Sequence, residues 1–205
     1  MSEWMCHYAL VYASAISEVN PMKKIIKQLI MLFTVVLLAF TAGVSAAQAA
    51  SPHFKKGGSP VCTVSISGST ATTTCRAVIT GLGGEDLLAT VTVSGAAVYQ
   101  CQNGGGNTAP GQNKVVIGPA VAPTFIDSSA IKNGNLTLNT LAAVLTAPST
   151  VTGAEAGCPN PNWTGVNPVV TVTSITLVIE QPPGTEIFNC TKTGTNLTGS
   201  VALTC

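Results

Sequence analysis

The sequence predicts an all-β domain in which two sheets pack face to face. Thr, Ser, Asn, Gly and Val dominate the chain after residue 50, and this mixture favours strands and turns over helices. Short alternating runs recur there, separated by Gly, Pro and Asn. Six cysteines follow residue 50, an even number that is typical of a disulfide-bonded exported chain. Together these observations predict an immunoglobulin-like β-sandwich, stapled by disulfides, over residues 61–205.

Strand-like runs follow one another at short intervals through this region. They cover residues 61–67, 70–79, 87–94, 96–102, 114–117, 123–127, 135–141, 169–180, 186–192 and 200–205. Apolar and polar residues alternate most regularly over 169–180, which predicts a long central strand. Residues 140–157 are the one stretch with room for a helical turn, although Thr and Val crowd it and Pro148 interrupts it.

The first 60 residues are interpreted as targeting and linking sequence. A basic run from Met22, an apolar core and a closing run of small residues occupy 22–50, in the order of a secretory signal peptide. Residues 1–21 are interpreted as an N-terminal extension from a misplaced start site, so that either Met1 or Met22 is the true start. An alternative is a genuine extension followed by an uncleaved membrane anchor. Residues 51–60 lack apolar periodicity and predict a flexible leader.

The first pair of cysteines is placed by a predicted hairpin. Gly68-Ser69 between two alternating runs is typical of a two-residue type II′ turn. Counting outward from this turn sets Cys62 opposite Cys75, at a non-hydrogen-bonded pair where the Cα atoms of the two strands are closest. A disulfide between Cys62 and Cys75 is therefore expected.

The other four cysteines are paired by position and by elimination. Cys190 and Cys205 lie symmetrically about the last predicted hairpin and are expected to bridge it. Cys101 and Cys158 then remain for each other, and they close a much longer loop. No Cys-x-x-Cys motif occurs, and His53 is the one histidine after residue 50, so neither a metal site nor a cofactor is expected.

Acidic and basic residues are equal in number after residue 50. The acids are Glu85, Asp86, Asp127, Glu155, Glu180 and Glu186, and the bases are Lys55, Lys56, Arg76, Lys114, Lys132 and Lys192. Six minus six gives a net charge of zero for this region. Because nucleic acids and anionic membranes are recognised through an excess of positive charge, the sequence predicts binding to neither once the signal is removed.

The stretch YQCQNGGGNTAPGQNK, residues 99–114, contains the candidate binding loop. It superficially resembles a phosphate-binding loop, but Gln112 and Asn113 separate Gly111 from Lys114 and no helix start follows. Two interpretations stay open: a loop that binds a partner, or a turn whose asparagines cap and whose glycines adopt positive φ. The candidate binding residues are Asn103, Gly104, Gly105, Gly106, Asn107, Asn113 and Lys114.

Side chains suited to catalysis are few. Glu85 and Asp86 are the one adjacent pair of carboxylates, and they are interpreted as part of a solvated loop. A serine nucleophile would need a base, and His53 lies in the predicted leader. Enzymatic activity is therefore not expected; a weak hydrolase using Glu85, Asp86 or Asp127 is the least favoured alternative. Trp163 is a candidate surface aromatic, and its alternative role is packing on a buried disulfide.

The stretch at 99–114 also resembles a known pattern. A tyrosine, a cysteine, an Asn-Gly-Gly-Asn run and an Asn-Lys, in that order, are similar to the hallmark of an uncharacterised family of small secreted bacterial proteins of actinobacterial type. The flanking SPHF, GLGGEDLLATVTV and GCPNPNWTGVNPVVTVTSITLVIE resemble that family as well. The sequence departs from it by an extra glycine in the loop and by its hairpin cysteines. The resemblance supports Cys101 with Cys158 as a shared disulfide and implies no catalytic residues.

These observations predict a secreted, non-catalytic interaction module, extracellular or associated with the cell surface. The expected partner is an extracellular protein or a cell-envelope polymer, and the module is expected to be a monomer. The alternative is a small-molecule carrier with an apolar cleft between a sheet and its loops.

Overall fold

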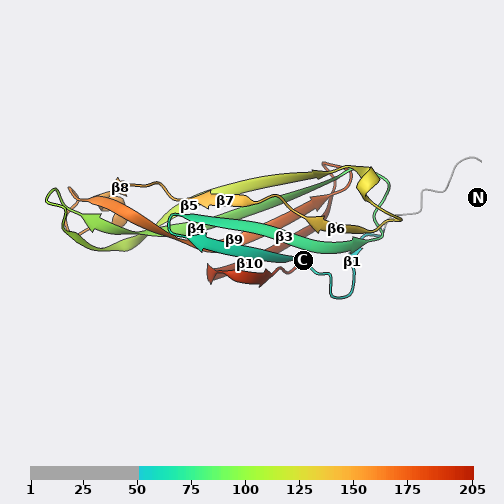
Figure 1. Cartoon of the computed structure of the whole chain (residues 1–205), viewed down its shortest axis with the longest axis horizontal. Helices are drawn as coiled ribbons and strands as arrows, with labels where there is room; N and C mark the ends of the chain where they lie inside the picture. Colours follow the sequence, from blue (N-terminus) through green and yellow to red (C-terminus); the bar gives the residue numbers. More distant parts are fainter. Residues whose placement is uncertain (1–50) are drawn as a thin grey trace, which may run out of the picture. The chain divides into compact units, whose positions relative to one another are not determined.

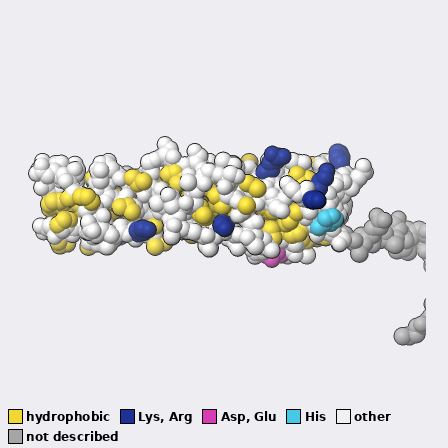
Figure 2. Space-filling model, turned by 90° about the horizontal axis from the view of Figure 1, so that it is seen from below, with side chains coloured by type: hydrophobic (Ala, Val, Ile, Leu, Met, Phe, Trp, Pro, Cys, Tyr) yellow, Lys and Arg dark blue, Asp and Glu magenta, His cyan; other side chains and the backbone are white. Residues whose placement is uncertain are grey.

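The computed structural model describes residues 51–205, which form two antiparallel sheets (Figure 1). Residues 1–21 and the predicted signal peptide (22–50) lie outside the described residues. Within the described part, no helix is both long enough and apolar enough to span a bilayer. Most of the face shown in Figure 2 is uncharged, and its few Lys and Arg side chains are spread along it, with more of them toward one end.

Sheet A has six strands, ordered β1-β3-β2-β11, with β6 and β7 also paired along β3. Its strands are β1 (His53–Phe54), β2 (Val61–Ser67), β3 (Thr70–Thr80), β6 (Leu136–Asn139), β7 (Ala143–Thr146) and β11 (Gly199–Ala202). Thr and Ser take most outward positions of β2 and β3, where β-branched and small polar side chains suit a strand face in contact with water, and Val61, Arg76 and Val78 take the others.

Sheet B has five strands, ordered β10-β9-β4-β5, with β8 also paired to β9. Its strands are β4 (Leu87–Gln102), β5 (Thr108–Ile126), β8 (Val151–Thr152), β9 (Thr164–Glu180) and β10 (Glu186–Leu197). Two short helices complete the described chain, η1 (Ser128–Ala130) and α3 (Gly153–Ala156). Helix α3 lies in the stretch 140–157, where the sequence left room for a helical turn.

The predicted first hairpin is confirmed in its register. Strands β2 and β3 pair Ser67 with Thr70 and Cys62 with Cys75. Gly68 has a φ of 54°, the left-handed value that the first position of a type II′ turn needs. The three predicted disulfides are all present, and they join Cys62 to Cys75, Cys101 to Cys158 and Cys190 to Cys205. The hairpin that Cys190 and Cys205 were expected to bridge is absent, because β10 pairs with β9 in one sheet and β11 pairs with β2 in the other.

Both sheets contribute to one apolar core. Buried positions alternate along β4 from Leu87 to Val93, as a strand with one face against a second layer requires. The same cluster contains Ile79 of β3, Leu145 of β7 and Ile175 of β9. The all-β prediction is therefore confirmed, with two sheets and three disulfides.

Strands β4, β5 and β9 continue beyond sheet A (Figure 1). The β2–β3 turn marks where sheet A ends, because the Val170 N–H of β9 donates to the Gly68 carbonyl at 3.0 Å. We call residues 98–113 and 164–169 the extension, and residues 147–163 the covering segment. The covering segment, and no strand of sheet A, packs on the inner face of the extension.

Two predicted strand breaks are absent from the structure. The runs 87–94 and 96–102 form one strand, β4, because Gly95 lets the chain pass close to the Thr171 carbonyl, where a Cβ would clash. The runs 114–117 and 123–127 likewise belong to one strand, β5, with register shifts against β4. Turn-like residues inside these strands are bulges, and sequence alone does not separate a bulge from a turn.

The flexible leader expected at 51–60 is replaced by ordered structure. His53 and Phe54 form β1 and pair with Thr80 and Ile79 of β3. The Phe54 ring lies 4.2 Å, centroid to centroid, from the Phe188 ring of β10. A two-residue strand carries no periodicity, so sequence reading missed β1, and for the same reason β8; β7 was hidden in the stretch assigned a helical turn.

Candidate functional site

The candidate binding loop closes the β4–β5 hairpin. The Asn103 side-chain oxygen accepts hydrogen bonds from the Gly105 N–H at 3.0 Å and the Asn107 N–H at 2.9 Å. The Asn103 carbonyl accepts from the Gly106 N–H, and Gly106 has a φ of 81°. Asn103 is therefore a turn-forming residue, and Gly104, Gly105, Gly106 and Asn107 are the exposed tip of the loop.

The second half of the motif forms a bulge beneath α3. Val98 pairs with Lys114 and Gln100 with Pro110, so residues 111–113 of β5 oppose Tyr99 alone. A Cβ on Gly111 would lie 2.6 Å from the Tyr99 carbonyl oxygen. Only glycine fits there, because β4, β5 and the covering segment approach one another at the backbone.

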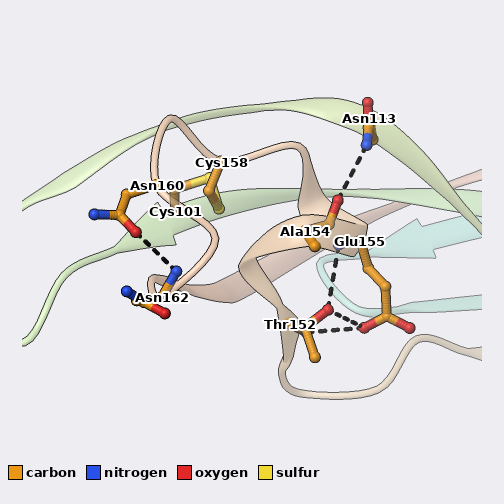
Figure 3. Close-up of a disulfide and its surroundings, with 8 residues drawn as sticks. All are labelled: Cys101, Asn113, Thr152, Ala154, Glu155, Cys158, Asn160 and Asn162. Atoms are coloured by element: carbon orange, nitrogen blue, oxygen red, sulfur yellow. Dashed lines mark hydrogen bonds between the residues drawn. A yellow bond between two sulfur atoms is a disulfide. The ribbon is translucent and has the colours of Figure 1, made fainter.

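Asn113 ties this bulge to the covering segment. Its Nδ2 donates to the Ala154 carbonyl of α3 at 3.3 Å (Figure 3). Gly157 ends α3 in the left-handed conformation, with a φ of 66°, and a Cβ there would lie 2.6 Å from the Asn113 Cγ. Asn113 thus supports the fold, whereas its neighbour Lys114 is exposed.

Helix α3 begins with a capping box. The Glu155 N–H donates to the Thr152 Oγ1, and the Glu155 carboxylate accepts from both the N–H and the hydroxyl of Thr152 (Figure 3). These hydrogen bonds lower the pKa of Glu155. The carboxylate is thereby held ionised as a helix cap.

Tyr99 and the Cys101–Cys158 disulfide fasten the covering segment to the extension. The Tyr99 hydroxyl donates to the Pro148 carbonyl at 2.9 Å, and the side chain is only 1 % exposed. Burial raises the pKa of Tyr99, and the nearby Glu155 charge raises it further. The disulfide sits ten residues further along the covering segment, with its Cα atoms 5.6 Å apart (Figure 3).

The end of the covering segment is ordered by its asparagines. The Asn162 N–H donates to the Asn160 side-chain oxygen at 2.9 Å (Figure 3), and the Trp163 N–H donates to the Asn160 carbonyl at 3.0 Å. Trp163 is half-buried and packs against the core. The structure therefore favours the packing role of Trp163 over the exposed one.

The outer face of the extension is open. It carries a shallow groove of about 280 Å³, lined by Val98, Tyr99, Gln100, Thr108, Ala109, Pro110, Asn167 and Val169. The Asn167 Nδ2 donates to the Gln100 Oε1 at 3.0 Å across the groove floor. Val169 is 57 % exposed although it lies on a central strand. The lining contains no charged side chain, so the groove offers apolar contacts and amide hydrogen bonds.

Sequence reading missed this groove, because none of the seven candidate binding residues lines it. Of the candidate loop, Asn103 and Asn113 serve the fold. The signal that was available was the alternation of β4 and β9, which sets Val98 and Val169 opposite each other on the outward side. Exposed valines are common on protein surfaces that bind no partner, so this pair did not identify a site by itself.

Two of the three carboxylates suggested for a hydrolase, Asp86 and Asp127, accept hydrogen bonds from backbone N–H groups. The Asp86 Oδ1 accepts from the Ser128 N–H, and the Asp127 Oδ1 accepts from the Ser129 N–H, each at 2.8 Å. The bonds to Ser129 lower the pKa of Asp127, which therefore stays ionised. Across residues 51–205, no three potential metal ligands of the His, Cys, Asp or Glu type come together.

Comparison with protein-family models, with curated proteins and with solved structures finds no match for this chain.

Proposed function

We propose that the domain is a secreted, non-catalytic binding module whose extension meets an extracellular protein or a cell-envelope polymer. One observation carries the proposal: the inner face of the extension is fixed by a disulfide, a buried tyrosine and a capped helix, while its outer face presents an uncharged groove. Rigid support of an open surface lowers the entropy lost on binding.

The shape of the groove favours an extended partner over a small ligand. Carrier proteins enclose most of an apolar ligand's surface. Here Thr108, Pro110 and Val169 at the groove are exposed, so a small molecule would stay largely in water. A strand, loop or polymer chain laid along the groove would gain apolar contact along its length. The carrier hypothesis is therefore the second candidate.

The remaining assignments rest on the sequence together with the fold. Three intramolecular disulfides indicate folding in an oxidising compartment, and the signal-like segment at 22–50 supports secretion. The two antiparallel sheets around one core support an immunoglobulin-like sandwich. The resemblance of the 99–114 motif to a family of secreted bacterial proteins fits the same proposal, and here the motif's residues build the clamp behind the groove.

A paired-variant capture experiment tests this proposal. The full chain is expressed, the secreted protein is immobilised, and partners are captured from the medium and envelope of the producing cells. Val169→Glu places a charge in the groove, and Val144→Glu is its matched control, since Val144 is 52 % exposed on β7 of sheet A.

We expect Val169→Glu to lose at least tenfold of the captured partner and Val144→Glu to retain it. A partner that both variants retain, or that both lose, would place the contact elsewhere and overturn the proposal.

A further inference from the structure

A second cavity lies on sheet A, at the end of the domain where β1 and β6 are found (Figure 1). Its volume is about 340 Å³, and it is lined by Gly57, Gly58, Ser59, Val61, Thr63, Arg76, Ala77 and Val78. The lining combines the loop between β1 and β2 with the outward side chains of β2 and β3. It shares no residue with the groove of the extension.

Backbone hydrogen bonds hold the loop that forms this cavity. The Lys55 N–H donates to the Val78 carbonyl and the Val78 N–H donates to the Gly58 carbonyl, both at 2.9 Å. The Gly58 N–H closes the turn on the Lys55 carbonyl at 2.6 Å. Gly58 is buried, and a Cβ there would lie 2.8 Å from the Val78 Cβ, while Gly57 has a φ of 75°. The cavity is therefore built into the fold by two glycines.

The charge around this cavity is positive, although the described domain is neutral as a whole. Arg76 is the one charged residue of the lining, and Lys55 and Lys56 lie in the same loop. None of the strands of sheet A contains an Asp or Glu. An anion in the cavity thus meets the Arg76 guanidinium and no carboxylate in the lining.

We infer that this cavity binds the phosphate group of a small phosphate ester. An arginine guanidinium presents paired N–H donors that match phosphate oxygens. The exposed Gly57 lets a ligand approach the backbone closely, and the Ser59 hydroxyl adds a neutral hydrogen-bonding group. Val61 and Val78 supply apolar contact for the carbon skeleton of a polyol, because the volume exceeds what a bare phosphate needs.

This inference goes beyond the proposed function and agrees with the predicted lack of nucleic-acid binding. Nucleic-acid recognition needs a track of many basic residues, and the strands of sheet A contain one, Arg76. The single arginine of the lining matches one phosphate group. The phosphate has two sources, a free ester or a repeating unit of an envelope polymer, and both present the same group to Arg76.

The test is a titration of the secreted, ¹⁵N-labelled protein with glycerol 1-phosphate and, separately, with soluble poly(glycerol phosphate). We expect chemical-shift changes at the amides of Gly57, Gly58 and Ser59. Arg76→Gln should weaken binding of either probe by about tenfold or more, because a charge-assisted hydrogen-bond pair is lost. Lys192→Gln is the matched control, since Lys192 is an exposed base on β10 of sheet B.

The outcomes separate the two sources and keep the inference falsifiable. If glycerol 1-phosphate binds in an Arg76-dependent way, the site accepts free esters as well as polymers. If only poly(glycerol phosphate) does so, the site is specific for polymers. Both results support the site. Absence of shifts with either probe overturns it, and so does equal binding by the wild type and Arg76→Gln. A dispersed ¹⁵N spectrum of Arg76→Gln, expected for an outward side chain, excludes unfolding as the cause of a loss. None of these readouts depends on the groove at Val169.

Discussion

The extension and the rest of the domain bury their strands by different means. We call the part of the domain in which sheet A faces sheet B the two-sheet half. In the two-sheet half, large aliphatic side chains from both sheets fill the space, among them Ile79, Leu145 and Ile175. In the extension, strands β4, β5 and β9 of sheet B are covered by the covering segment, which contains the short helix α3. Its buried contacts come from Tyr99, from Ala156 and from glycines whose backbones touch other backbones. Where the second sheet ends, a crosslink and close backbone packing replace aliphatic burial.

This difference explains the structural role of the 99–114 motif. Asn103 shapes the hairpin tip, Gly111 permits close approach, and Asn113 anchors α3. These residues keep a thin part of the molecule rigid. A thin, rigid sheet with one free face is a suitable platform for a partner, and it is also the part most sensitive to loss of a tether.

Removal of the Cys101–Cys158 disulfide has the largest expected effect. On chain entropy, a closed loop of 57 residues stabilises by about 4 kcal/mol, against about 3 kcal/mol for the 13-residue loop of Cys62–Cys75. C101A/C158A is therefore expected to lower the free energy of unfolding more than C62A/C75A in urea titrations. Hydrogen exchange should show the covering segment losing protection in C101A/C158A alone. Unchanged protection there would mean that packing, without the crosslink, holds the extension.

Removal of a buried hydroxyl has the next largest expected effect on the free energy of unfolding. The expected change has opposite signs in the two regions. Thr73 Oγ1 is buried in the two-sheet half and has no hydrogen-bond partner within residues 51–205. Thr73→Val, which keeps the shape, is expected to raise the free energy of unfolding by about 1 kcal/mol. Tyr99→Phe removes the bond to Pro148 and is expected to lower it by about 1 kcal/mol.

The same urea titrations measure both changes. Destabilisation by Thr73→Val would mean that its hydroxyl is satisfied in solution. A neutral Tyr99→Phe would mean that the ring, and not its hydroxyl, holds the covering segment.

Acid sensitivity of α3 is the smallest expected effect. The Thr152 hydrogen bonds hold the pKa of Glu155 below its ordinary value of 4.5. A carboxyl whose pKa is lower in the folded chain stabilises the fold above its ordinary pKa, and this stabilisation is lost as pH falls through the folded pKa. Below pH 4.5, amides of the covering segment are therefore expected to exchange faster, relative to the intrinsic rate, in the wild type.

Glu155→Gln should remove most of this pH dependence, because a neutral cap does not titrate. Asp127→Asn is the matched control, since Asp127 also has a lowered pKa but caps η1. If Asp127→Asn abolished the pH dependence of the covering segment, its acid sensitivity would come from the two-sheet half.

Local patterns determined much of this molecule. A two-residue turn at Gly68 fixes which residues face each other in β2 and β3, so the Cys62–Cys75 pairing followed from counting. The other pairings followed from symmetry and elimination, and most strands followed from alternation with a period of two. The strands and the Cys62–Cys75 pairing depend on residues that are neighbours in sequence or across one hairpin, and sequence carries that information directly.

Tertiary structure alone decided the rest. Whether Gly95 ends a strand or lets it pass close to another depends on the position of the Thr171 carbonyl, 76 residues away. The covering segment, the groove at Val169 and the cavity at Arg76 each join parts of the chain that no local pattern links. The sequence by itself determined the disulfides, the all-β class and the shortage of charge. The tertiary structure decided which face of the extension is covered, which is open and where the few charged side chains lie. These properties depend on contacts between distant strands, and the residues alone do not specify them.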